Sequence, residues 1–168
     1  MNLLSPERYD RLMRFVPVLS LLFLAAIPTV ALAEEESDPP YWASIRASEV
    51  NMRVGPSGDF AISWVYQRQG LPLKVVRKKE GWRLVHDPDG SQGWVVARFL
   101  SRERSAIVKK GAPAPMRKEP NEQSALRWKL APGVVGKLGE CESDWCQLDV
   151  VGHKGWVRQD RLWGAGEP

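Results

Sequence analysis

Two cysteines and two histidines are the residues in this chain best suited to metal binding or nucleophilic catalysis. Cys141 and Cys146 are separated by Glu-Ser-Asp-Trp, and the histidines are His86 and His153. A structural zinc site needs four ligands, and His153 alone does not complete one with the cysteines. A thiol enzyme needs a cysteine, a histidine and an orienting polar group in an enclosed site. Only Cys146 with His153 suggests such a pair, so we expect no catalytic residue, no metal and no cofactor.

Other patterns associated with catalysis are incomplete. Glu140 and Glu142 lie beside a predicted hairpin, where a solvated face explains them. The segment Gly55-Pro56-Ser57-Gly58 lacks the lysine and the following helix of a phosphate-binding loop. A disulfide between Cys141 and Cys146 across the hairpin fits an oxidising compartment. Closing so short a loop would contribute about 2 kcal/mol.

The first 33 residues have the anatomy of a secretory signal peptide. A basic leader precedes the apolar run Phe15–Ile27, and Ala31-Leu32-Ala33 places small residues at the −3 and −1 positions of a cleavage site before Glu34. The alternative is an uncleaved membrane anchor, because the segment from Phe15 to Ala33 is uncharged and about long enough to span a bilayer. We favour cleavage after Ala33, which predicts a periplasmic or secreted protein without stable membrane insertion.

The charge of the chain gives little information about its partners. The whole chain carries a formal net charge of +4, and removing residues 1–33 leaves +3. The basic runs Arg77-Lys78-Lys79 and Lys109-Lys110 are too short to indicate a nucleic-acid interface. We therefore expect no nucleic-acid partner. A mildly basic surface fits anionic envelope polymers and ordinary solubility equally well.

An internal repeat is the most informative feature of the sequence. Residues 45–100 align with residues 107–162 at a spacing of 62 to 64. Six of the eight tryptophans pair in this alignment, and only Trp42 and Trp163 do not. The shared landmarks include Met52-Arg53 with Met116-Arg117, Trp64 with Trp128, Trp82 with Trp145, and Gly93-Trp94-Val95 with Gly155-Trp156-Val157. The chain is thus predicted to hold two copies of one small domain.

Each copy has the pattern of a small β barrel. Short segments rich in valine, leucine and tryptophan alternate with turn residues, as in Trp82–His86 and Gln92–Val96, which flank Asp87-Pro88-Asp89-Gly90. A single helical turn is expected at Ala97–Leu100. A domain of about 60 residues buries only about 60% of its unfolded surface, so large aromatic side chains must stabilise it. We expect Trp82, Trp145, Trp94 and Trp156 to anchor the two cores.

The first copy resembles the bacterial SH3 domain family. The residues that carry the resemblance are Val50-Asn51-Met52-Arg53-Val54-Gly55-Pro56-Ser57, Gly81-Trp82-Arg83-Leu84-Val85, Gly93-Trp94-Val95 and Phe99-Leu100. The second copy departs from the family pattern at Ala114–Pro120, where the asparagine and the glycine before proline are missing. The resemblance implies an all-β fold of two tandem five-stranded SH3-like barrels behind a cleavable signal peptide.

The resulting domain organisation accounts for nearly the whole chain, and we expect no room for a hydrolase domain. The predicted segments are a signal peptide at 1–33, a flexible acidic segment at 34–42, SH3-like domain 1 at 43–101, a linker at 102–105, SH3-like domain 2 at 106–164 and a tail at 165–168.

The resemblance implies a binding function, because members of the family are usually exported modules that bind peptidoglycan or peptides. We expect a non-catalytic module of the cell envelope that recognises peptidoglycan or a wall-associated protein. Two alternatives stay open: a structural protein that docks a partner without a small ligand, and a minimal thiol enzyme. By analogy with the aromatic ridges of SH3 domains, the candidate ligand-binding residues are Arg53, Trp64, Tyr66, Trp82, Trp128 and Trp145.

Overall fold

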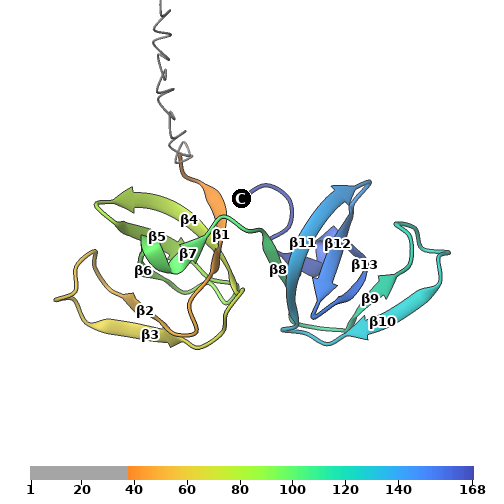
Figure 1. The fold of residues 1–168 in the computed structure, drawn as a ribbon, viewed down its shortest axis with the longest axis horizontal. Helices are drawn as coiled ribbons and strands as arrows, with labels where there is room; N and C mark the ends of the chain where they lie inside the picture. The colour runs from red at the N-terminus through yellow and green to blue at the C-terminus, as the bar shows by residue number, and fades with distance from the viewer. Residues whose placement is uncertain (1–37) are drawn as a thin grey trace, which may run out of the picture. The chain divides into compact units, whose positions relative to one another are not determined.

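Each half of the chain forms one antiparallel sheet of short strands. The structure, a computed structural model, describes residues 38–168. In the first half the strands follow the order β3-β2-β6-β5-β4-β1-β7 across the sheet (Figure 1). They are β1 (Tyr41–Ile45), β2 (Val50–Arg53), β3 (Ile62–Tyr66), β4 (Pro72–Lys79), β5 (Trp82–His86), β6 (Gln92–Val96) and β7 (Leu100–Ser101), with the 3₁₀ turn η1 (Ala97–Phe99) before β7.

The second half repeats this order with the strands shifted by seven. Its sheet runs β10-β9-β13-β12-β11-β8-β14. The elements are β8 (Ser105–Val108), β9 (Ala114–Arg117), β10 (Leu126–Leu130), β11 (Val135–Glu142), β12 (Trp145–Val150), β13 (His153–Arg158), η2 (Gln159–Arg161) and β14 (Leu162–Trp163). The tandem all-β fold and the helical turn after β6 are confirmed. Each sheet has seven strand segments where the sequence predicts five, and the seven include the short β7 and β14, which pair with β1 and β8.

The start of the first domain lies slightly earlier than the predicted boundary. Strand β1 begins at Tyr41, and its pairing with β4 places Tyr41 and Trp42 in the sheet rather than in a flexible segment. Strand β8 likewise begins at Ser105, one residue before the predicted start of domain 2. The predicted signal peptide, residues 1–33, lies outside the described residues. No helix in the part that the structure describes is long and apolar enough to cross a membrane.

Most positions of the two cores correspond. Ala43, Ile45, Met52, Val85 and Val95 of the first core occupy the places of Ala106, Val108, Met116, Leu148 and Val157 in the second. Three pairs differ in chemistry: Tyr66 is replaced by Leu130, Leu73 by Gly136, and Arg83 by the core residue Cys146. The repeat in the sequence is therefore a repeat of the buried interior.

Two of the four tryptophans expected to anchor the cores, Trp94 and Trp145, are buried, and the other two are only half-buried. Both buried clusters are aliphatic except for Met, Tyr and Cys side chains, and neither contains a tryptophan. Trp94 and Trp145 are 9% and 3% exposed, whereas Trp82 and Trp156 are half-buried. The physical reason is size, because a barrel this small is filled by its aliphatic side chains and large indoles lie at its margin.

Candidate ligand-binding grooves

The six candidate residues fall into three environments. Trp64 and Trp128 are 59% and 48% exposed. Arg53 and Trp82 are half-buried. Tyr66 and Trp145 are only 5% and 3% exposed, so almost none of either ring is open to solvent. The candidates thus do not form one aromatic ridge, and two of them are mainly structural.

Arg53 and Trp82 line the same groove on the first domain. This groove, hereafter the domain 1 groove, has a volume of about 420 Å³. Strand β2 supplies Arg53, β5 supplies Trp82, and the turn η1 supplies Arg98 and Phe99. Asn51, Gly58, Glu80, Gly81 and Val96 complete the lining. The loop between β2 and β3 and the β4–β5 hairpin therefore border the groove.

The domain 1 groove combines aromatic surface with positive charge. The Arg98 guanidinium lies 4.8 Å from the centroid of the Phe99 ring. The Arg53 Nη1 donates a hydrogen bond to the Phe60 carbonyl oxygen at 2.6 Å, which leaves other guanidinium donors for a ligand. Glu80 is the only carboxylate in the lining. Such a groove suits a ligand that carries carboxylates.

In the second domain, the tryptophan equivalent to Trp82 is Trp145, and an arginine side chain lies over its ring. By strand register, Trp82 pairs with Val96 and Trp145 pairs with Arg158. The Arg158 guanidinium lies 5.7 Å from the centroid of the Trp145 ring. Trp145 is 3% exposed, whereas its partner in the repeat, Trp82, is half-buried.

The motif arginine is also engaged more completely in the second domain. Arg117 Nη1 donates to the Ser124 carbonyl at 2.8 Å, as Arg53 does to the equivalent carbonyl in domain 1. Arg117 Nη2 additionally lies 3.3 Å from the Glu122 carboxylate. The two domains therefore share the loop-tying hydrogen bond, but only Arg117 has this ion pair.

Trp64 and Tyr66 line a different groove, where the two domains meet. This junction groove has a volume of about 540 Å³ and takes residues from both barrels. The Tyr66 hydroxyl donates to the Asp87 carboxylate at 3.1 Å and also contacts Met52 Sδ. Burial, with the negative charge of Asp87 next in size, raises the pKa of Tyr66 above its ordinary value. Tyr66 is thus a structural residue at the wall of the groove.

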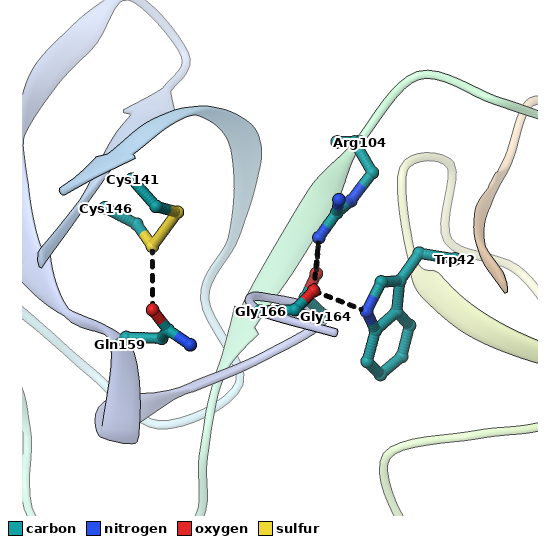
Figure 2. Close-up of a disulfide and its surroundings, with 7 residues drawn as sticks. All are labelled: Trp42, Arg104, Cys141, Cys146, Gln159, Gly164 and Gly166. Atoms are coloured by element: carbon teal, nitrogen blue, oxygen red, sulfur yellow. Dashed lines mark hydrogen bonds between the residues drawn. A yellow bond between two sulfur atoms is a disulfide. The ribbon is translucent and has the colours of Figure 1, made fainter. Parts of the chain in front are cut away.

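The two tryptophans left over by the repeat come together at the junction. The ring centroids of Trp42 and Trp163 lie 4.7 Å apart with an edge-on interplanar angle of 76°. Figure 2 shows Trp42 Nε1 and the Arg104 guanidinium directed at the carbonyls of the chain's last turn, which belong to Gly164 and Gly166. Their distances to the Gly166 oxygen are both 3.1 Å. Gly166, in the predicted tail, therefore contacts Trp42 in the first strand of domain 1.

Trp128 is exposed but partly covered by a neighbour. The His153 ring lies 4.5 Å from it, centroid to centroid, in a tilted arrangement. The Arg127 Nη1 on the same strand donates to the Lys154 carbonyl. The exposed Trp128 thus has one aromatic contact already and lines neither of the two grooves.

The predicted disulfide is confirmed. Cys141 on β11 and Cys146 on β12 are paired in the sheet and bonded, with their Cα atoms 4.0 Å apart (Figure 2). Lys78 and Arg83 form the equivalent cross-strand pair in domain 1. The bond leaves neither sulfur as a free thiol nucleophile. Within residues 38–168, no group of three or more histidine, cysteine or acidic side chains is placed to hold a metal ion.

The family is decided by a match that covers both barrels. The family model described as "Bacterial SH3 domain" matches residues 46–102 and again residues 110–164. The chain belongs to the bacterial SH3 domain family. Two tandem copies of this domain were predicted from the sequence. No curated protein matches the chain.

Solved structures similar to this pair of SH3 domains are distant. NlpC2 from Trichomonas vaginalis is 10% identical, with 76% of this chain and 49% of that chain covered and a TM-score of 0.35. An NlpC/P60 family protein from Bacillus cereus is 14% identical, with 73% and 56% covered and a TM-score of 0.32. "Endolysin LysPBC5 CBD" is 12% identical, with 76% and 95% covered and a TM-score of 0.29. This chain spans about half the length of the NlpC structures, and similarities this low carry no argument about its function.

Sequence reasoning missed several residues of the grooves between and beside the SH3 domains. Arg98 and Phe99 lie in the short turn after β6, where nothing in the spacing distinguishes them from surface residues. Trp163 carried a usable signal, because it and Trp42 were the tryptophans without a partner in the repeat. An unpaired aromatic residue in a duplicated sequence indicates a contact outside the duplicated unit.

Proposed function

We propose that this tandem SH3 protein is an exported, non-catalytic binding module of the bacterial cell envelope that recognises peptidoglycan or a wall-associated peptide. The observation that carries the proposal is the domain 1 groove. It offers the rings of Trp82 and Phe99 beside the guanidinium groups of Arg53 and Arg98, with one carboxylate in its lining.

The chemistry of the groove favours peptide carboxylates as ligands. Guanidinium groups bind carboxylates through charge-assisted, often paired hydrogen bonds. Aromatic rings beside them provide apolar surface for the body of an extended peptide. The stem peptides of peptidoglycan and the acidic side chains of wall proteins both offer this combination.

Two features support an envelope location. The disulfide between Cys141 and Cys146 is typical of proteins in oxidising compartments. The sequence of residues 1–33 has the pattern of a cleavable export signal. Both features fit a periplasmic or secreted protein.

Co-sedimentation with purified sacculi tests the proposal. We expect the protein to pellet with sacculi, and retention to fall as salt rises because the contacts are ionic. Arg98→Glu should reduce retention strongly, because it reverses a charge in the domain 1 groove without removing a buried side chain. Lys129→Glu is the matched control: Lys129 is exposed, has no side-chain partner among the described residues, and lines neither groove.

Two results would contradict the proposal. One is a protein that stays in the supernatant at every salt concentration. The other is retention of Arg98→Glu equal to that of Lys129→Glu, which would separate sacculus binding from the domain 1 groove.

A further inference from the structure

The junction groove is a second concave surface, and both SH3 domains build it. Domain 1 supplies Trp64, which is 59% exposed, and domain 2 supplies the half-buried Trp163. Leu71 and Ile107 add apolar surface, one from each domain. The volume of about 540 Å³ exceeds that of the domain 1 groove. Neither domain alone contains this surface.

The walls of the junction groove are held in place without a ligand. Arg104 donates to the Gly164 carbonyl at 2.9 Å, and Trp42 packs edge-on against Trp163. A Cβ atom on Gly164 would lie 2.5 Å from the Ser105 carbonyl oxygen, so the last turn of the chain approaches β8 closely. A preformed groove avoids the ordering cost that a ligand would otherwise have to offset.

The acidic groups of the junction groove already have hydrogen-bond or ion-pair partners within the protein. Asp89 forms an ion pair with Lys110 at 2.8 Å. Asp87 accepts the Tyr66 hydroxyl through one carboxylate oxygen and the backbone N–H groups of Asp89 and Ser91 through the other. Asp89 is thus paired with a cation, and Asp87 keeps its charge but has both carboxylate oxygens engaged by donors of the protein.

Two cations in the lining have no such partner. Arg68 and Lys109 are exposed, and neither side chain has an ion pair or hydrogen bond among the described residues. One comes from each domain. The junction groove thus presents aromatic and apolar surface together with a net positive charge, because its lining holds three cationic side chains and two carboxylates.

We propose that the junction groove is a second binding site, distinct from the domain 1 groove, that takes an acidic peptide in extended form. Apolar side chains of the peptide lie against Trp64 and Trp163, and its carboxylates are directed to Arg68 and Lys109. The complementary charge selects for acidic rather than neutral peptides. The site requires both domains, which gives the tandem arrangement a role in recognition.

An NMR titration with a defined probe tests this site. The probe is an N-acetylated hexapeptide of alternating glutamate and leucine, added to ¹⁵N-labelled protein expressed from the full-length chain. The reporters are the indole N–H signals, assigned with single tryptophan-to-phenylalanine variants. We expect the Trp64 and Trp163 signals to shift together. The same peptide with glutamine in place of glutamate should bind about tenfold more weakly.

Charge reversal gives the matched comparison. Arg68→Glu with Lys109→Glu should weaken binding of the glutamate probe by about tenfold or more. The control, Lys118→Glu with Lys129→Glu, makes the same charge change at exposed positions outside both grooves and should leave the affinity nearly unchanged.

Three results would overturn the inference. They are unshifted Trp64 and Trp163 signals, equal affinity for the glutamate and glutamine probes, and equal effects of the two double variants. A shift of Trp82 alone would place the probe in the domain 1 groove, which rejects the junction site and leaves the proposed function standing.

Discussion

At the residue scale, single positions distinguish the two SH3 domains more than their folds do. Val96 in domain 1 corresponds to Arg158 in domain 2, and this one difference accompanies an accessible Trp82 and a covered Trp145. Tyr66 and Leu130 are the second such pair. The tyrosine brings a hydroxyl and a buried hydrogen bond to Asp87 into the first core.

The Tyr66 hydroxyl should make the stability of the protein sensitive to alkaline pH. Because burial raises the folded-state pKa of Tyr66, its stabilising contribution is fully present below the ordinary value of 10.0 and is lost as pH rises toward the folded-state value. Urea unfolding across this range should show a falling free energy of unfolding. Tyr66→Phe should make this decrease smaller, and it should lower the free energy of unfolding by about 1–3 kcal/mol at neutral pH.

In Tyr66→Phe the fall of the free energy of unfolding with rising pH should become smaller but should not disappear. The reason is that burial also raises the pKa of Tyr41. An unchanged alkaline slope in Tyr66→Phe would show that the buried tyrosine does not titrate as inferred.

Val151 is a residue in an unfavourable backbone conformation. It lies in the turn between β12 and β13 with φ of 52°, and its side chain is 95% exposed. A β-branched residue is strained there, and exposure means that little packing is lost on substitution. Val151→Asn should therefore raise the free energy of unfolding by about 1 kcal/mol, measured by denaturant unfolding.

Val54→Asn provides the control for Val151→Asn. Val54 is also a largely exposed valine outside the strands, at 63%, but its φ is not positive. A stabilisation of equal size at Val54 would show that the gain comes from removing exposed apolar surface instead of relieving strain.

At the scale of elements, the shared glycine-tryptophan-valine segment has a steric origin. A Cβ atom on Gly93 would lie 2.5 Å from Met52 Cγ and 2.9 Å from the Arg53 carbonyl oxygen. On Gly155 it would lie 2.5 Å from Met116 Cγ and 2.8 Å from the Arg117 carbonyl oxygen. Each glycine thus lets β6 or β13 cross closely over β2 or β9.

This close approach predicts that a methyl group added at Gly155 destabilises the fold. Gly155→Ala should lower the free energy of unfolding by about 1–3 kcal/mol, because the Arg117 carbonyl cannot move without disturbing the sheet. Denaturant unfolding measures the change. Gly58→Ala is the comparison, since a Cβ atom there meets nothing within 4 Å, and it should be nearly neutral. Equal costs at both positions would contradict the steric explanation.

Many strand positions could be predicted from the sequence, but the burial and contacts of individual side chains could not. The strands Trp82–His86 and Gln92–Val96 and the disulfide follow from alternation, turn residues and cysteine spacing. Trp145 has Arg158 beside its ring, and this neighbour lies on the adjacent strand and has no signature in the local sequence. The core position of Tyr66 and the grooves depend on contacts between segments far apart in the chain, which periodicity does not report.

At the scale of the whole molecule, the two SH3 domains belong to one compact unit of contacts. Trp42, Trp163 and Arg104 join the end of domain 2 to the first strand of domain 1. Burial at this contact lowers the pKa of the Arg104 guanidinium from its ordinary value. The contact explains why the two tryptophans outside the repeat are present.

Loss of this contact should uncouple the unfolding of the two domains. Calorimetry of the unaltered protein should give one cooperative transition, with calorimetric and van't Hoff enthalpies equal. Arg104→Ala with Trp163→Ala should give two transitions. The control Arg102→Ala removes a nearby guanidinium that stacks on Tyr41 within domain 1 and should keep one transition. A single transition in the double variant would contradict the coupling.

Ligand binding at the domain 1 groove is tested most directly by comparing the NMR signals of Trp82 and Trp145 within one molecule. Soluble muropeptides carrying free stem carboxylates would be titrated into ¹⁵N-labelled protein, and the indole N–H signals of Trp82 and Trp145 followed. We expect the Trp82 signal to shift in a saturable manner, Arg98→Glu to abolish the shift, and the signal of the covered Trp145 to stay unchanged. A stationary Trp82 signal, or equal shifts at Trp82 and Trp145, would contradict binding at the domain 1 groove.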